Sequence, residues 1–153
     1  MDSVIKVLKE ERYVSYSSSN ATGELIIVRQ TDELVAFLSR NEAIEVLVDR
    51  PEKIEHFTAD LPDAAWDLLD LEQENLQLSF QPKRALPSSL LELPSISFRV
   101  IYDKQGLQLL RRFNGCLLSG RTKNTRPDAV SLQLIPQKKM DHISFDEKGR
   151  ISI

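Results

Sequence analysis

The sequence has one cysteine, Cys116, among its 153 residues, and this scarcity excludes an internal disulfide. A lone thiol suits a reducing compartment, and the N-terminal residues lack the basic and apolar stretches of a secretory signal, so we predict a cytoplasmic protein. No apolar run approaches the roughly 18 residues that cross a bilayer, which predicts no membrane partner. Cys116 lies in an apolar segment, which favours a buried, unreactive thiol over a nucleophile.

Aromatic residues and histidines are also scarce. Aromatics make up 7% of the chain and do not alternate with basic residues, which disfavours a surface on which single-stranded bases stack. The two histidines, His56 and His142, have no histidine or cysteine at metal-binding spacing, so no metal site is predicted. The sequence also lacks a catalytic triad and a phosphate-binding Gly-x-x-x-x-Gly-Lys loop, and no catalytic residue is assigned.

Charge is distributed unevenly along the chain. Residues 1–76 hold 7 Lys and Arg against 17 Asp and Glu, a net charge of −10, and residues 77–153 hold 13 against 6, a net charge of +7. A basic half can concentrate an anionic partner even on a protein that is acidic overall. The alternative is that the two halves neutralise each other within one fold.

Helical and strand-like periodicities alternate along the chain, which is typical of an α/β domain. We expect helices near residues 4–8, 32–38, 51–57, 63–69, 88–93 and 107–113. We expect strands near 13–16, 25–28, 43–48, 76–80, 96–100, 116–118 and 130–135, followed by a hairpin of 143–145 and 150–153. No linker divides the chain, so the sequence predicts one domain over 1–153, a twisted, mixed, mainly parallel sheet with helices on its faces.

The most informative segment is the loop predicted after the strand 116–118. Gly115 is expected to end a helix, and the loop then offers Ser119, Arg121, Lys123 and Asn124. Hydroxyls, amides and cations at the carboxyl end of a strand are suited to holding a phosphate. A solvated loop that is basic by chance is the alternative.

Two other places offer candidate ligands for an anion. Ser18 and Asn20 lie in the polar loop 17–23, which could bind phosphate oxygens or form a solvated turn. Arg99 lies in the middle of a strand, where burial is costly unless the guanidinium is paired or bound to a ligand. An exposed strand face is the alternative for Arg99.

Taken in order, these segments resemble the YrdC-like family. The run Tyr16–Gly23 resembles the family's Tyr-Pro-Thr-x-Thr-x-Tyr-Gly segment. Arg40 occupies the position of the lysine in the family's Lys-x-Arg motif. Ser97–Val100 resembles a family strand that carries an arginine at the position of Arg99. Gly115–Asn124 resembles the family's Gly-Pro-Leu-x-Ser-Thr-Ser-Ala-Asn segment.

The resemblance implies a site for ATP, threonine and bicarbonate, because active members make threonylcarbamoyl-adenylate for tRNA modification. Two departures affect that chemistry: Glu42 replaces the arginine, and Arg121 replaces a small residue. We therefore expect a pseudoenzyme that binds double-stranded or tRNA-like RNA, or a nucleotide such as ATP, and no DNA. The alternatives are an active enzyme with an altered site and a non-catalytic interaction domain. The candidate nucleotide- or RNA-binding residues are Ser18, Asn20, Arg40, Arg99, Ser119, Arg121, Lys123 and Asn124.

Overall fold

The computed structural model describes residues 1–18, 21–58, 60–122, 129–136 and 138–152. Its helices are α1 (Asp2–Lys9), α2 (Asp32–Arg40), α3 (Pro51–Thr58), α4 (Asp63–Leu69), α5 (Ser88–Leu91) and α6 (Lys104–Arg111). Its strands are β1 (Val14–Ser17), β2 (Thr22–Ile26), β3 (Glu42–Val48), β4 (Leu76–Phe80), β5 (Ile96–Val100), β6 (Cys116–Thr122), β7 (Val130–Ser131), β8 (Asp141–Phe145) and β9 (Ile151–Ser152). In this part of the chain, no helix is long and apolar enough to span a membrane.

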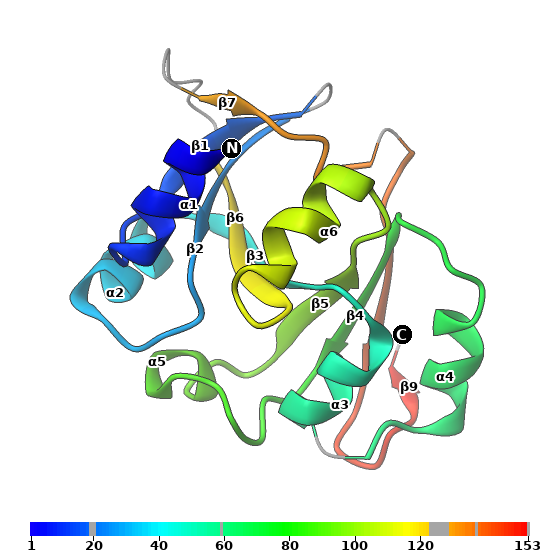
Figure 1. Ribbon diagram of the computed structural model, residues 1–153. Helices are drawn as coiled ribbons and strands as arrows, with labels where there is room; N and C mark the ends of the chain where they lie inside the picture. Colours follow the sequence, from blue (N-terminus) through cyan, green and yellow to red (C-terminus); the bar gives the residue numbers. More distant parts are fainter. Residues whose placement is uncertain (19–20, 59, 123–128, 137, 153) are drawn as a thin grey trace.

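The strands form a single mixed sheet in the order β7-β1-β2-β6-β3-β5-β4-β8-β9 (Figure 1). The pairs β1–β7, β3–β5 and β4–β8 are parallel, and the other five pairs in the described residues are antiparallel. The α/β architecture with helices on both faces is confirmed. Parallel pairing is less extensive than the alternation of elements indicates, because β6 returns antiparallel between β2 and β3.

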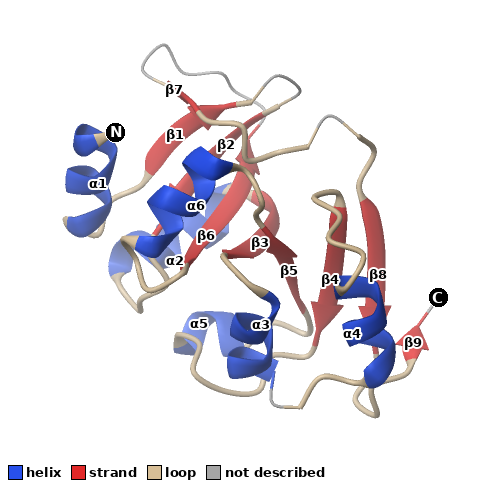
Figure 2. Cartoon of the chain, turned by 45° about the vertical axis from the view of Figure 1, so that its right-hand side comes forward, coloured by secondary structure: helices blue, strands red, loops and turns tan. Residues whose placement is uncertain are grey.

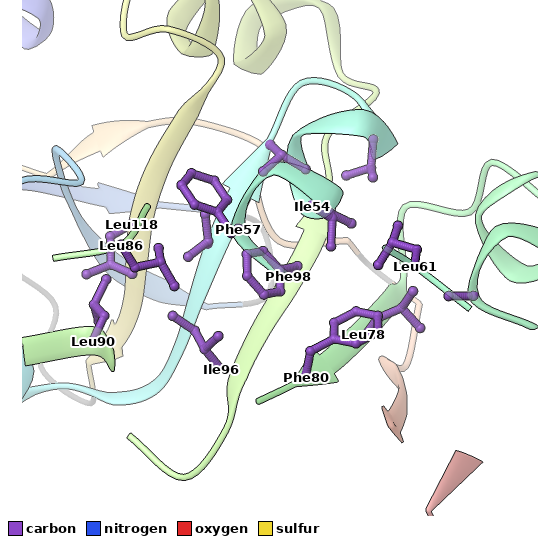
Figure 3. Close-up of a cluster of buried hydrophobic side chains, with 14 of the residues drawn as sticks. Ile54, Phe57, Leu61, Leu78, Phe80, Leu86, Leu90, Ile96, Phe98 and Leu118 are labelled. Carbon is purple, nitrogen blue, oxygen red and sulfur yellow. The ribbon is translucent and has the colours of Figure 1, made fainter. Parts of the chain in front are cut away.

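Side chains alternate between the two faces of the sheet, and each face has its own apolar core. Val46 and Val48 of β3 point to a core that includes residues of α2, α3, α4 and α5, part of which is shown in Figure 3. Leu47 points to the other core, which includes residues of α1 and α6. Of these two helices, α1 contacts β1 and α6 contacts β6, and both are labelled in Figure 1.

Local signals fix several of these elements as expected. The Thr31 hydroxyl accepts a hydrogen bond from the Leu34 amide at 3.0 Å and caps the start of α2. Gly115 has a φ of 81°, the left-handed conformation that commonly follows a helix end, in the turn between α6 and β6. The expected stop at Gly115 lies in this turn, whereas α6 itself ends at Arg111 with Arg112 as its C-cap.

Three expected boundaries were wrong. The strand expected at 116–118 continues to Thr122, so Ser119 and Arg121 belong to β6 and not to a loop. The strand expected at 25–28 covers Thr22–Ile26, and the one expected at 130–135 contains only Val130 and Ser131. In the first two cases, pairing with neighbouring strands outweighs the loop-like composition of small and polar residues.

Candidate functional site

A row of polar side chains crosses five adjacent strands on one face of the sheet, β6, β3, β5, β4 and β8. Figure 2 labels these five strands. Glu45 of β3 is aligned with Ser119 of β6 and Ser97 of β5, and Ser79 of β4 is aligned with Ser97 and with Ser144 of β8. Residues two positions away on a strand share its face, so Arg99, Gln77 and His142 belong to the same surface. We call this surface the polar face.

Arg99 is buried at the centre of the polar face. Its Nη2 lies 2.8 Å from Oε1 of Glu45, and its Nε lies 3.2 Å from both carboxylate oxygens. Nη2 also donates to the carbonyl oxygen of Leu134 at 2.5 Å. The side chains of Arg99 and Glu45 are 1% and 3% exposed, so this is a fully buried, hydrogen-bonded ion pair. A guanidinium in this state is neutralised and screened from any solvent-borne anion.

A chain of hydrogen bonds connects the carboxylate of Glu45 to residues of β4 and β8. Gln77 Nε2 donates to Glu45 Oε2 at 2.6 Å, and the side-chain Oε1 of Gln77 lies 2.7 Å from Nδ1 of His142. Nε2 of His142 lies 3.2 Å from the hydroxyl of Ser79, which lies 2.7 Å from that of Ser97. These polar groups satisfy one another, so the centre of the polar face is internally paired.

Tyr16 lies at the other side of Ser119. Its hydroxyl is 2.8 Å from the Ser119 hydroxyl, and its ring crosses Gly23, where a Cβ would lie 2.7 Å from ring atoms. Burial raises the pKa of Tyr16 to about 12, against the smaller opposing effects of the Ser119 hydrogen bond and of the charges on Arg99 and Arg121. Arg121 is aligned with Gly23 and with Glu42, and it is half-buried beside this cluster.

The hydroxyl of Ser18 forms hydrogen bonds to the main chain of the segment 132–135. It donates to the carbonyl oxygen of Leu132 at 2.6 Å and accepts from the amides of Leu134 and Ile135 at 3.2 Å. Because Arg99 binds the Leu134 carbonyl, Ser18 and Arg99 hold the same stretch of main chain. Both side chains therefore have structural partners.

Arg40 belongs to a separate cluster. Its Nε donates to Oε1 of Glu24 at 2.8 Å, and the Asn41 amide donates to the same oxygen at 2.9 Å. Glu24 alternates with Leu25, which is aligned with Ser119, so Glu24 points away from the polar face. The guanidinium of Arg40 also lies 4.3 Å from the centre of the Tyr13 ring, a cation–π contact.

Of the eight candidates, the structure gathers Ser119, Arg99 and Arg121 around Tyr16 and places Ser18 against the adjoining segment. It ties Arg40 to a cluster on the opposite face. Asn20, Lys123 and Asn124 lie outside the described residues.

The residue that sequence reasoning missed is Glu45. A carboxylate between Ile44 and Val46 in a buried strand is an anomaly that requires a cationic partner, and Arg99 was the matching anomaly. Pairing the two requires knowing that β3 and β5 are neighbours, which a single sequence does not reveal. In the described residues, no group of three or more His, Cys, Asp or Glu side chains could hold a metal ion.

Neither a protein-family model nor a curated protein sequence matches the chain. Solved structures do match. E. coli YciO is 10% identical, with a TM-score of 0.74, over 96% of this chain and 84% of that one. A variant of P. abyssi Sua5 is 10% identical, with a TM-score of 0.70, over 93% of this chain and 51% of that one. The chain has the YrdC-like fold.

The YrdC-like fold also matches part of a larger protein. Full-length HypF in its phosphate- and nucleotide-bound form is 14% identical, with a TM-score of 0.69, over 94% of this chain and 26% of that one. This chain thus spans about half the length of the Sua5 structure and about a quarter of HypF. At such low identity the similarity establishes the fold, and the YrdC-like expectation from the sequence is confirmed at that level.

Proposed function

We propose that this chain is a YrdC-like RNA-binding protein that contacts the phosphates of double-stranded or tRNA-like RNA and does not form an adenylate. One observation carries the proposal. Arg99, the arginine that the family resemblance assigns to the site, is buried and neutralised by Glu45.

The side chains present do not fit an ATP site on the polar face. Binding the triphosphate requires cations whose charge faces the ligand. Here Arg99 is paired with Glu45, and the hydroxyls of Ser18 and Ser119 already have protein partners. Arg40 lies on the opposite face of the sheet, where it is paired with Glu24. A ligand of high negative charge would have to displace these contacts and would meet the Glu45 carboxylate.

The support for RNA is the charge that remains at the edge of this face. Arg121 is half-buried beside Tyr16, and the second half of the chain carries a net charge of +7. Backbone phosphates of a duplex need surface cations and a matching shape, and need few aromatic side chains. The scarcity of aromatics in the chain therefore favours a duplex over a single strand.

The test is fluorescence anisotropy of a labelled tRNA-like hairpin over roughly 50 to 200 mM salt. We expect affinity to fall steeply with salt, and Arg121→Gln to weaken binding and reduce the salt slope by about 1, the signature of one lost phosphate contact. Arg50→Gln is the matched control, because Arg50 is an exposed arginine beyond the opposite end of β3.

Three results would contradict the proposal. Equal weakening by Arg50→Gln and Arg121→Gln would mean that only bulk charge matters. No binding at the lowest salt would favour a protein-interaction domain. Pyrophosphate release from ATP in the presence of threonine and bicarbonate would favour the active-enzyme alternative.

A further inference from the structure

A second cationic region lies at the other end of the sheet, away from the polar face. It is a pocket with a volume of about 460 Å³, within the range typical of small-molecule sites. Cys116, the first residue of β6, lines it, whereas Ser119 and Arg121 lie further along the same strand. The pocket and the polar face therefore occupy different stretches of one strand.

Five basic side chains from separate parts of the chain converge on this pocket. They are Lys9 at the end of α1, Arg29 after β2, Lys53 and His56 on α3, and Arg112 at the end of α6. None of the described residues that line the pocket is acidic. We call it the basic pocket.

The neighbouring carboxylates leave much of this charge in place. Glu11 pairs with Arg29 at 2.7 Å, but both side chains are exposed, so that pair is weak. Burial raises the pKa of the Cys116 thiol, the nearby Lys53 lowers it, and Asp49 adds a smaller rise. Lys53 and Arg112 have no ion pair within the described residues and are the strongest candidates for holding an anion.

The rest of the lining is apolar. Ile27 and Val28 follow β2, Phe57 comes from α3, and Phe113 follows α6. Phe57 is buried, and its ring is stacked on that of Phe98 with centroids 6.0 Å apart, which fixes this wall. Cys116 adds a neutral thiol, because burial raises its pKa to about 11. Cations beside a rigid apolar wall suit a ligand with an anionic end and an apolar or aromatic body.

We propose that the basic pocket binds a small phosphorylated molecule, with the phosphate on Lys53 and Arg112 and an aromatic or aliphatic body against Ile27, Val28 and Phe113. A phosphate accepts several charge-assisted hydrogen bonds, and a forked guanidinium with an ammonium is a recurrent way to hold it. The proposal stands independently of RNA binding at the polar face.

The experiment is an NMR titration of the ¹⁵N-labelled protein with AMP, adenosine, glucose 6-phosphate and inorganic phosphate. We expect saturable shifts with AMP at the amides of residues 27–29, 53–57 and 112–116. Adenosine lacks the phosphate and glucose 6-phosphate lacks an apolar body, so both should bind more weakly than AMP.

Matched variants separate a specific site from general charge. The double variant Lys53→Gln/Arg112→Gln should weaken AMP binding about tenfold or more, because hydrogen bonds to charged groups are lost. Lys104→Gln/Arg111→Gln removes the same charge from exposed positions on α6 outside the pocket and should leave the affinity within about twofold. Arg121→Gln should also leave AMP binding unchanged, which keeps this test distinct from that of RNA binding.

Four results would overturn the proposal. They are no saturable binding of any of the phosphates, equal loss in both double variants, AMP-induced shifts confined to the polar face, and glucose 6-phosphate binding as tightly as AMP. A fifth result, a duplex RNA that shifts the same amides at lower concentration than AMP, would also overturn the proposal and would reassign the pocket to RNA.

Discussion

The polar face and the basic pocket use the same kinds of side chain in opposite ways. On the polar face, Arg99 is buried and lies 2.8 Å from a carboxylate, with every contact supplied by the protein. In the basic pocket, Lys53 and Arg112 share a lining in which no described residue is acidic. A buried cation must be neutralised by a nearby protein group, whereas the charge of a cation at a solvent-open rim remains available to attract an anionic ligand. Resemblance to a family site therefore does not by itself identify where a fold can bind an anion.

The strand β6 connects the polar face and the basic pocket, so the two regions can be compared along one strand. It starts at Cys116 in the basic pocket and reaches Ser119 and Arg121 beside the polar face. It lies between β2 and β3, so its position is set by pairing on both sides. Substitutions at the two ends can be compared on one rigid element.

The largest effect is expected from breaking the Arg99–Glu45 pair. Arg99→Met should lower the free energy of unfolding by about 3–5 kcal/mol, because it leaves the Glu45 carboxylate buried without a partner. Urea denaturation measures this directly. The double variant Glu45→Gln/Arg99→Met should recover most of the loss, since it leaves no unpaired charge. A loss below about 1 kcal/mol for Arg99→Met would show that water screens the pair as it does surface ion pairs.

The sequence predicted the local parts of this arrangement and missed the non-local ones. The expected helix near 32–38 and strand near 96–100 are both present, and short-range geometry accounts for the cap at Thr31 and for the left-handed Gly115 after α6. The partner of Arg99 is 54 positions away, and nothing local to either residue specifies that β3 and β5 are neighbours.

Two further features required the assembled sheet. The residues after Leu118 have a loop-like composition, yet they form a strand because β2 and β3 pair with it on both sides. Gly120 makes this packing feasible, since a Cβ there would lie 2.6 Å from the Cβ of Asn41. The basic pocket combines residues from α1, α3, α6 and the segment after β2, so no single motif could indicate it.

The second largest effect is expected in the reactivity of Cys116, at the end of β6 that lines the basic pocket. Burial raises its thiol pKa from 9.0 to about 11, so at about pH 8 the folded protein should hold roughly a hundredfold less thiolate than the denatured chain. The rate of reaction with a small disulfide reagent, measured with and without urea, reports this difference. Lys53→Gln should slow the native reaction further, because the Lys53 charge favours the thiolate, whereas Lys104→Gln should not. Equal rates in the folded and denatured protein would show that the thiol is open to solvent.

The smallest effect is expected at the polar end, from Tyr16→Phe. Near neutral pH the variant should lose about 1 kcal/mol of unfolding free energy, because the buried Ser119 hydroxyl loses its 2.8 Å partner. The pKa of Tyr16 is raised from 10.0 to about 12 in the folded protein, so its stabilising contribution is complete below pH 10 and is lost as the pH rises toward 12. Urea denaturation across this range should show the wild type losing stability relative to Tyr16→Phe. Parallel pH profiles of unfolding free energy for the two proteins would mean that the phenol ionises as readily in the folded state as in the unfolded chain. The polar end of β6 would then be hydrated like the rim of the basic pocket.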